Sequence, residues 1–177
     1  MKLSEKTLNK NYIYKGKILS LRRDDAILPD GKTAVREVVE HSGGSAIYCE
    51  MDGKVLLVKQ FRYPYGEVIY EIPAGKLNLG EDPEETAIRE LEEEGGVLAE
   101  KVVKLFDVYP SPGYTDEIIR IYRAENVRKT EIHLDEDEFL DSEWVDKERL
   151  KQMIQSGEIK DGKTLIALLY VFNGEMK

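Results

Sequence analysis

Three glutamates lie close together on one expected helix and could bind a metal ion. Glu90 is spaced i,i+3 from Glu93 and i,i+4 from Glu94, which places the three carboxylates on one side of a helix. Like charges at these spacings destabilise a helix unless a cation offsets them. Hard cations such as Mg²⁺ and Mn²⁺ prefer oxygen ligands, and Mg²⁺ commonly bridges carboxylates to substrate phosphates. The alternative is a solvated acidic face, which is the commoner use of a glutamate-rich helix.

The helix that carries these glutamates has recognisable ends. Asp82 is expected to cap its first amides, Pro83 suits the first helical position, and Glu85 could complete a capping box. Gly95-Gly96 is expected to end it, since glycine readily takes the left-handed conformation of a helix end. The side next to the carboxylates is apolar and could dock on a sheet through Ala87, Ile88 and Leu91.

The rest of the chain predicts a mixed α/β (α+β) fold with many strands and few helices. Turn residues at 29–31 and 51–53 predict two hairpins, one joining 18–28 to 33–40 and one joining 46–50 to 54–60. Further strands are expected at 68–72, 101–109, 117–124 and 140–145. Two more helices are expected at 147–156, capped by Asp146, and at 163–172. Such a sequence favours a mixed sheet covered by helices, preceded by a β-rich lead-in.

Composition and charge limit the partners of the chain. Its 177 residues suit one domain with a sizeable core, and its formal net charge of −9 opposes binding to nucleic acid backbones or anionic membranes. A phosphate-bearing ligand would therefore need bound cations or placed arginines. The single cysteine, Cys49, cannot form an internal disulfide and lies in an apolar run, which predicts a buried strand residue. We expect neither a signal peptide nor a membrane span, and we expect a cytoplasmic protein.

The segment 75–97 resembles a known family. It reads GKLNLGEDPEETAIRELEEEGGV and matches every fixed position of the Nudix hydrolase signature, G-x5-E-x7-R-E-U-x-E-E-x-G-U, where U is apolar. The resemblance implies a Nudix fold, an α/β/α sandwich with a mixed β-sheet. It also implies metal-dependent hydrolysis of a nucleoside diphosphate linked to another group.

The resemblance implies a role for each matching residue. Glu90 and Glu94 would be the principal metal ligands, with Glu93 in or near the same set and the carbonyl of Ala74 as a further ligand. The metal would be Mg²⁺, with Mn²⁺ as the alternative. Arg89 would orient the glutamates by salt bridges. Glu81 and Gly75 would support the site.

Segments outside the signature resemble the ADP-ribose pyrophosphatase branch of this family. They read QFRYP at 60–64, YEIPAG at 70–75, SPGYTDE at 111–117 and DGKT at 161–164. By this resemblance Arg36 and Arg62 would hold phosphates, and Glu117 would contact the terminal ribose. An aromatic ring would stack on the adenine, with Tyr14, Tyr12 and Tyr63 as candidates.

The same branch places the catalytic base in an acidic loop near the C-terminal part. In this chain the loop is 134–139, and Glu136 is the expected base with Glu138 in reserve. Residues 1–42 would form a β-rich dimerisation and substrate-binding element, followed by the Nudix domain over 43–177. The resemblance therefore implies a homodimer.

Two other functions compete with hydrolysis of ADP-ribose to AMP and ribose 5-phosphate. The substrate could be another nucleoside diphosphate sugar such as GDP-mannose. Alternatively, the chain could bind ADP-ribose without cutting it. Loss of signature glutamates would favour such a sensor, but all four are present at positions 81, 90, 93 and 94.

Overall fold

The computed structural model describes residues 3–134 and 138–175. It divides into two compact units. The first comprises Met1–Gly43 with Tyr109–Ile118, and the second comprises Gly44–Val108 with Ile119–Lys177. Each unit is described by itself.

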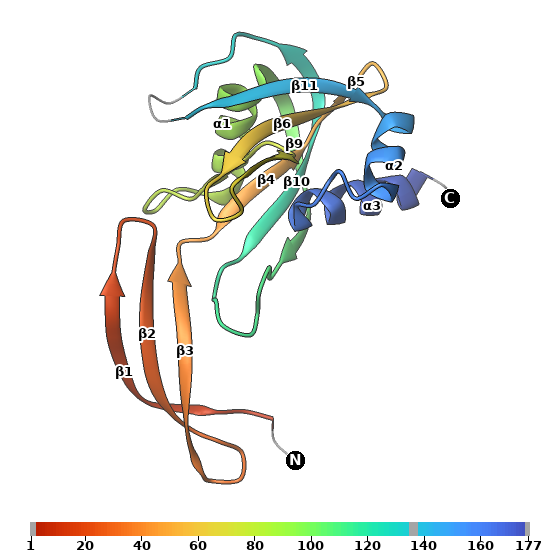
Figure 1. Cartoon of the computed structure of the whole chain (residues 1–177). Coiled ribbons are helices and arrows are strands. Elements are labelled where there is room, and N and C mark those ends of the chain that lie inside the picture. The colour runs from red at the N-terminus through yellow and green to blue at the C-terminus, as the bar shows by residue number, and fades with distance from the viewer. Residues whose placement is uncertain (1–2, 135–137, 176–177) are drawn as a thin grey trace. The chain divides into compact units, whose positions relative to one another are not determined.

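The first unit is built on a three-stranded antiparallel sheet in the order β1-β2-β3 (Figure 1). Its strands are β1 (Lys6–Lys15), β2 (Leu19–Ile27) and β3 (Thr33–His41). The turn between β2 and β3 contains Gly31 at φ 87°, which confirms the predicted first hairpin. Strand β1 was not predicted, because its apolar and polar residues do not alternate regularly, and the structure leaves the whole strand exposed.

The second unit contains two four-stranded sheets. The first has the order β8-β4-β10-β9, in which β4 and β10 are parallel and the other pairs are antiparallel. Its strands are β4 (Gly44–Tyr48), β8 (Ala74–Lys76), β9 (Val97–Val108) and β10 (Ile119–Lys129). The second sheet comprises β5 (Glu50–Met51), β6 (Lys54–Arg62), β7 (Glu67–Glu71) and β11 (Leu140–Asp146).

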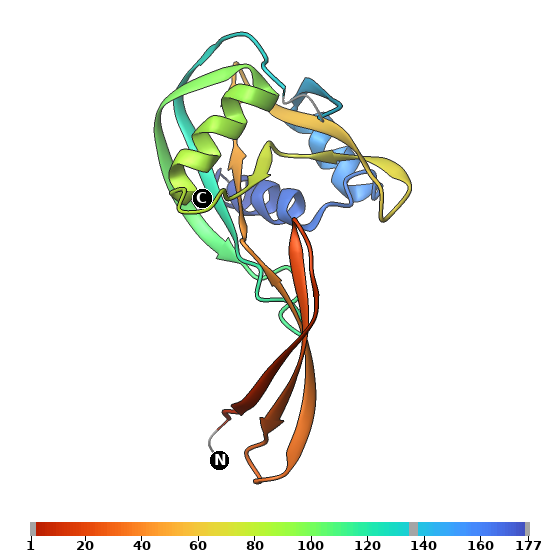
Figure 2. The same cartoon turned by 90° about the vertical axis from the view of Figure 1, so that its left-hand side faces the viewer.

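Strand β4 and residues 55–58 of β6 are buried on both faces, so two hydrophobic clusters form on opposite sides of them. Helix α1 (Pro83–Gly95) lies against β4 and β9 (Figure 2). It packs with Ile47 and Leu56, whereas Ala46 and Leu57 belong to the cluster that contains α2 (Lys147–Gln155) and α3 (Gly162–Glu175). Adjacent strand residues point to opposite faces, so this alternation produces a helix–sheet–helix sandwich. The expected fold class is confirmed.

The structure corrects three details of the sequence analysis. The predicted second hairpin is wrong in part, because only Glu50–Met51 pairs with β6, whereas β4 inserts between β8 and β10. Strand β8 was not among the predicted strands. Asp146 precedes α2 as predicted, but its side chain makes no capping hydrogen bond.

Two predictions about burial and membrane spans can be compared with the structure. Cys49 is fully buried in the cluster beneath α1, and burial raises the pKa of its thiol to about 12. A buried neutral thiol is a poor nucleophile, which fits the predicted burial. The predicted strand position is wrong, because Cys49 lies between β4 and β5. Among the described residues, every helix is too short or too polar to cross a bilayer.

Candidate active site

Helix α1 begins and ends where the sequence predicts, although Asp82 caps the amide of Glu84 and not that of Glu85. The Asp82 carboxylate accepts a hydrogen bond from the Glu84 N–H at 2.8 Å, and Pro83 occupies the first helical position. Gly96 ends the helix in the left-handed conformation at φ 59°, with its N–H bonded to the Glu92 carbonyl. These ends fix which side of the last two turns faces the sheet.

The last turns of α1 place two carboxylates in the interior. Glu90 and Glu94 are 4% and 3% exposed. One carboxylate oxygen from each, together with one from Glu138, lies within 4.8 Å of the others. The Ala74 N–H donates to Glu94 Oε2 at 2.9 Å, so β8 holds this carboxylate in place. The three carboxylates therefore converge from a helix and from the segment that precedes β11.

Burial makes ionisation of the two helix carboxylates costly. It is the main cause that raises the pKa of Glu90 to about 7 and that of Glu94 to about 8, and the charge of Glu138 adds to both. A bound divalent cation would remove this cost. Its positive charge offsets the repulsion between the carboxylates and stabilises their ionised forms, which water cannot reach in the interior. Clustered carboxylate oxygens are also the donors that Mg²⁺ and Mn²⁺ prefer. The residues present therefore fit a hard divalent cation.

Arg89 connects two further carboxylates, those of Glu81 and Glu93, to Glu90 of this cluster. Its Nε lies 2.9 Å from Glu81 Oε1, and its Nη1 lies 2.8 Å from Glu90 Oε1 and 2.7 Å from Glu93 Oε2. The hydrogen bond from Arg89 lowers the pKa of Glu81 to about 2. Glu93 thus lies with the guanidinium and is not one of the three converging carboxylates.

Arg62 also meets a buried carboxylate. Its guanidinium bonds to both oxygens of Glu71, at 2.5 Å and 2.7 Å, and Lys163 contacts Glu71 as well. Burial opposes ionisation of Glu71. The hydrogen bond from Arg62 and the charge of Lys163 outweigh burial and hold the pKa of Glu71 below its ordinary value. Glu71 and Lys163 were not among the predicted site residues.

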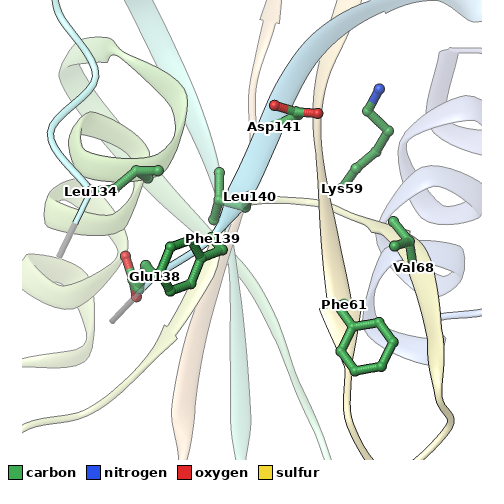
Figure 3. A pocket seen from close by; sticks show the side chains of 8 residues that line it. All are labelled: Lys59, Phe61, Val68, Leu134, Glu138, Phe139, Leu140 and Asp141. Carbon is green, nitrogen blue, oxygen red and sulfur yellow. The ribbon is translucent and has the colours of Figure 1, made fainter. Parts of the chain in front are cut away.

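A cavity of about 590 Å³ adjoins the carboxylate cluster through Glu138. This volume lies in the range of small-molecule sites. Figure 3 shows Glu138 beside Phe139, with Phe61 and Val68 across the cavity. Leu134, Leu140, Lys59 and Asp141 complete the lining. Both Phe61 and Phe139 are exposed, but nothing in the sequence indicates that their rings line the same cavity.

Several expected substrate contacts lie on the first unit. Arg36 pairs with Glu5, at 2.9 Å and 2.6 Å. Glu117 lies 3.4 Å from the His41 imidazole. Tyr14 and Tyr12 of β1 are both exposed, whereas the third aromatic candidate, Tyr63, belongs to the second unit and is also exposed.

The structure describes only one of the two candidates for the catalytic base. Glu136 lies outside the described residues. Glu138, the reserve, belongs to the converging carboxylates.

The segments that build the site match known families. The NUDIX domain model matches residues 39–168, which is more than half of the chain. This chain belongs to the Nudix family. Residues 5–39 of this Nudix protein also match a model described as the nucleoside diphosphate sugar hydrolase N-terminal domain.

Similar proteins agree with this assignment. Over 172 residues the chain is 45% identical to a protein of Bacillus subtilis named ADP-ribose pyrophosphatase, covering 96% of this chain and 93% of that protein. It is 43% identical over 170 residues to the methanol dehydrogenase activator of Bacillus methanolicus, covering 94% and 92%. A crystal structure of an ADP compounds hydrolase matches with a TM-score of 0.85 at 20% identity, covering 98% of this chain and 95% of that one, which supports the fold.

Proposed function

We propose that this Nudix protein is an ADP-ribose pyrophosphatase that hydrolyses ADP-ribose to AMP and ribose 5-phosphate. The observation that carries the proposal is that the buried carboxylates of Glu90 and Glu94, on a helix with an intact Nudix signature, converge with the partly buried carboxylate of Glu138. The relative from Bacillus subtilis supports the substrate. In this reaction the oxygen of one water bonds to one phosphorus, the bond from that phosphorus to the bridging oxygen breaks, and the bridging oxygen leaves with the other phosphate.

The proposed cofactor is a divalent cation, Mg²⁺ first and Mn²⁺ as the alternative. Glu90, Glu94 and the Ala74 carbonyl would hold it, with Glu93 in or near the same set. When bound, such a cation polarises the pyrophosphate and neutralises the charge that develops during its cleavage. It also explains how a chain of net charge −9 accepts an anionic substrate.

The chain's own residues orient the cluster and move a proton. Arg89, with Glu81 and Glu93 as its partners, holds Glu90 in one orientation. A carboxylate must accept a proton from the attacking water within hydrogen-bond reach or through one further water. Glu136 is the proposed base. Glu138 remains the reserve, and its place in the cluster suits either a base or a metal ligand.

The remaining contacts are proposed from the resemblance to the ADP-ribose pyrophosphatase branch. Arg36 and Arg62 hold phosphates, because planar guanidinium groups bond phosphate oxygens in pairs. Glu117 accepts hydrogen bonds from the terminal ribose, and Tyr14 stacks on the adenine, with Tyr12 and Tyr63 as alternatives. Residues 1–42 serve as the dimerisation and substrate-binding element before the Nudix domain at 43–177. We further propose a cytoplasmic homodimer that binds neither nucleic acid nor membranes.

A substrate panel tests the proposal. Purified protein is incubated with ADP-ribose, GDP-mannose and other nucleoside diphosphate sugars, with and without Mg²⁺, and the products are resolved. Preferred, Mg²⁺-dependent release of AMP from ADP-ribose supports it. Preference for GDP-mannose would replace the substrate, and tight binding of ADP-ribose without cleavage under any metal would indicate a sensor.

A further inference from the structure

The first turn of α3 is tied to the segment that leads into the Nudix motif. Asp161 Oδ2 accepts hydrogen bonds from the Thr164 N–H at 2.9 Å and from the Thr164 hydroxyl at 2.6 Å. Because that hydroxyl donates its hydrogen to Asp161, its oxygen is left to accept from a second partner. It accepts from the Ile72 N–H at 2.8 Å, and Thr164 is fully buried. The bond joins residues 92 positions apart.

The segment 72–74 leads from the end of β7 into the first residue of β8 and is held by three hydrogen bonds. Its Ile72 N–H donates to Thr164, and its Ala74 N–H donates to the Glu94 carboxylate at 2.9 Å. Pro73, between them, has no N–H to donate. Its carbonyl accepts from the Ile47 N–H at 2.9 Å. The position of the Ala74 amide against Glu94 therefore depends on the path that Thr164 sets two residues earlier.

Lys163 reaches the start of the same segment through a buried carboxylate. Its side chain is 10% exposed, contacts Glu71 and lies 3.1 Å from Asp161 Oδ2. Glu71 is 2% exposed and also bonds to Arg62 through both oxygens. Because Lys163 offsets part of the Glu71 charge, less of the Arg62 charge is neutralised. More of the Arg62 charge can then act on an anion.

We propose that Thr164 and Lys163 are positioning residues of the hydrolytic site. Thr164 positions the Ala74 amide and hence Glu94. Lys163 determines how much of the positive charge of Arg62 is left by Glu71 to act on a phosphate. This inference rests on the proposed function, since it concerns the cation and phosphate of that reaction. It gives a role to the DGKT segment at 161–164, which the function itself leaves unused.

The Thr164 half is tested with two nearly isosteric substitutions. Thr164→Val removes the hydroxyl and leaves the Ile72 N–H without its partner, whereas Thr164→Ser keeps the hydroxyl. We expect kcat to fall about tenfold to a hundredfold in Thr164→Val, the range that small displacements at a reacting centre produce. We expect Mn²⁺ affinity, measured by titration calorimetry on the same protein, to weaken as well. Thr164→Ser should restore both quantities.

The Lys163 half is tested by charge removal. Lys163→Met should raise KM for the nucleotide by about tenfold, the effect of weakening one charge-assisted hydrogen bond, and should change kcat less. Lys160→Met is the matched control, because Lys160 pairs with exposed Glu67 at 2.7 Å outside this network. It should leave kcat and KM unchanged. A second control, Leu150→Val at a buried core position of α2, measures what general loss of stability does to activity.

The outcomes separate this proposal from the proposed function. Wild-type protein that cleaves no nucleotide of the panel contradicts the function, and the Mn²⁺ titrations of the Thr164 variants then decide the positioning role alone. The Thr164 role is overturned if Thr164→Val folds and keeps the wild-type kcat and Mn²⁺ affinity. It is also overturned if Leu150→Val, with the same melting temperature as Thr164→Val, loses as much kcat. If Thr164→Val does not fold, Lys163→Met decides: a KM equal to that of Lys160→Met overturns the proposal.

Discussion

A Cβ atom on Gly75 would lie 1.7 Å from Oε1 of Glu90. No side chain fits there while Glu90 keeps its place, since real Cβ atoms do not approach other atoms within 3.0 Å. The first glycine of the signature thus leaves room for a carboxylate. It is required by this close approach and not by a left-handed backbone.

Gly75→Ala should displace Glu90 and inactivate the protein. We expect turnover to fall by about a hundredfold or more, because a misplacement of about 1 Å at a reacting centre has an effect of that size. Gly174→Ala is the control, because a Cβ at Gly174 meets nothing within 4 Å and alanine favours a helix. Turnover assays and melting curves of both variants check the prediction. Equal turnover in the two variants would contradict it.

Glu94→Gln should have a larger effect than Glu93→Gln. Glu94 is buried among the converging carboxylates, whereas Glu93 pairs with Arg89. Losing the charge of Glu94 should lower Mg²⁺-dependent turnover by orders of magnitude. The melting curve in EDTA should stay normal or rise, because glutamine removes the cost of burying a group that is ionised in the unfolded state. Losing Glu93 should have the smaller effect on turnover. Near-normal turnover of Glu94→Gln would contradict its assignment as a metal ligand.

The stability of the metal-free protein should fall as pH rises. The folded-state pKa values of Glu90 and Glu94, about 7 and about 8, lie above the ordinary value of 4.5. Between those values the folded state holds protons that the unfolded state has lost, so raising pH from 5 to 8 favours unfolding. At this chain length about 1 kcal/mol corresponds to about 2–4 °C in Tm.

Thermal melts from pH 5 to pH 8 in EDTA check this prediction. Saturating Mg²⁺ should remove the decline, because the cation stabilises the ionised carboxylates. The double substitution Glu90→Gln with Glu94→Gln should flatten the profile in EDTA. A profile in EDTA that is flat for the wild type would show that these carboxylates are already ionised in the metal-free fold.

Glutamine substitutions should also identify the base. Glu136→Gln should lower kcat far more than it raises KM, since a base acts chiefly in the transition state. Glu138→Gln shows the same pattern if Glu138 is the base instead, whereas a weaker Mn²⁺ affinity would indicate a metal ligand. Steady-state kinetics and metal titrations on both variants distinguish these roles. A wild-type kcat in Glu136→Gln would exclude it as the base.

The sequence predicted what local chemistry determines. The ends of α1 follow from Asp82, Pro83 and Gly96, so the helix and the spacing of its glutamates were evident before the structure. The fold class followed from the order of strands and turns. The signature residues were recognised because they lie within 23 positions of one another.

Contacts between distant segments could not be predicted in this way. Nothing in the sequence indicates that Glu138 meets Glu90, or that Thr164 bonds to the amide of Ile72. The assignment of β4 and β5 to different sheets depends on competition between strand partners, which a turn signal at 51–53 does not reveal. Burial was also missed for Glu71, because a charged residue in a strand is ordinarily exposed unless it is paired.

The most direct test of the central claim is hydrolysis of ADP-ribose by the wild-type protein, with Mg²⁺ and with EDTA, alongside Glu94→Gln. We predict release of AMP and ribose 5-phosphate only with Mg²⁺, and only by the wild type at a substantial rate. Undiminished release of AMP in EDTA, or no cleavage of ADP-ribose by folded, Mg²⁺-saturated wild-type protein, would contradict the claim.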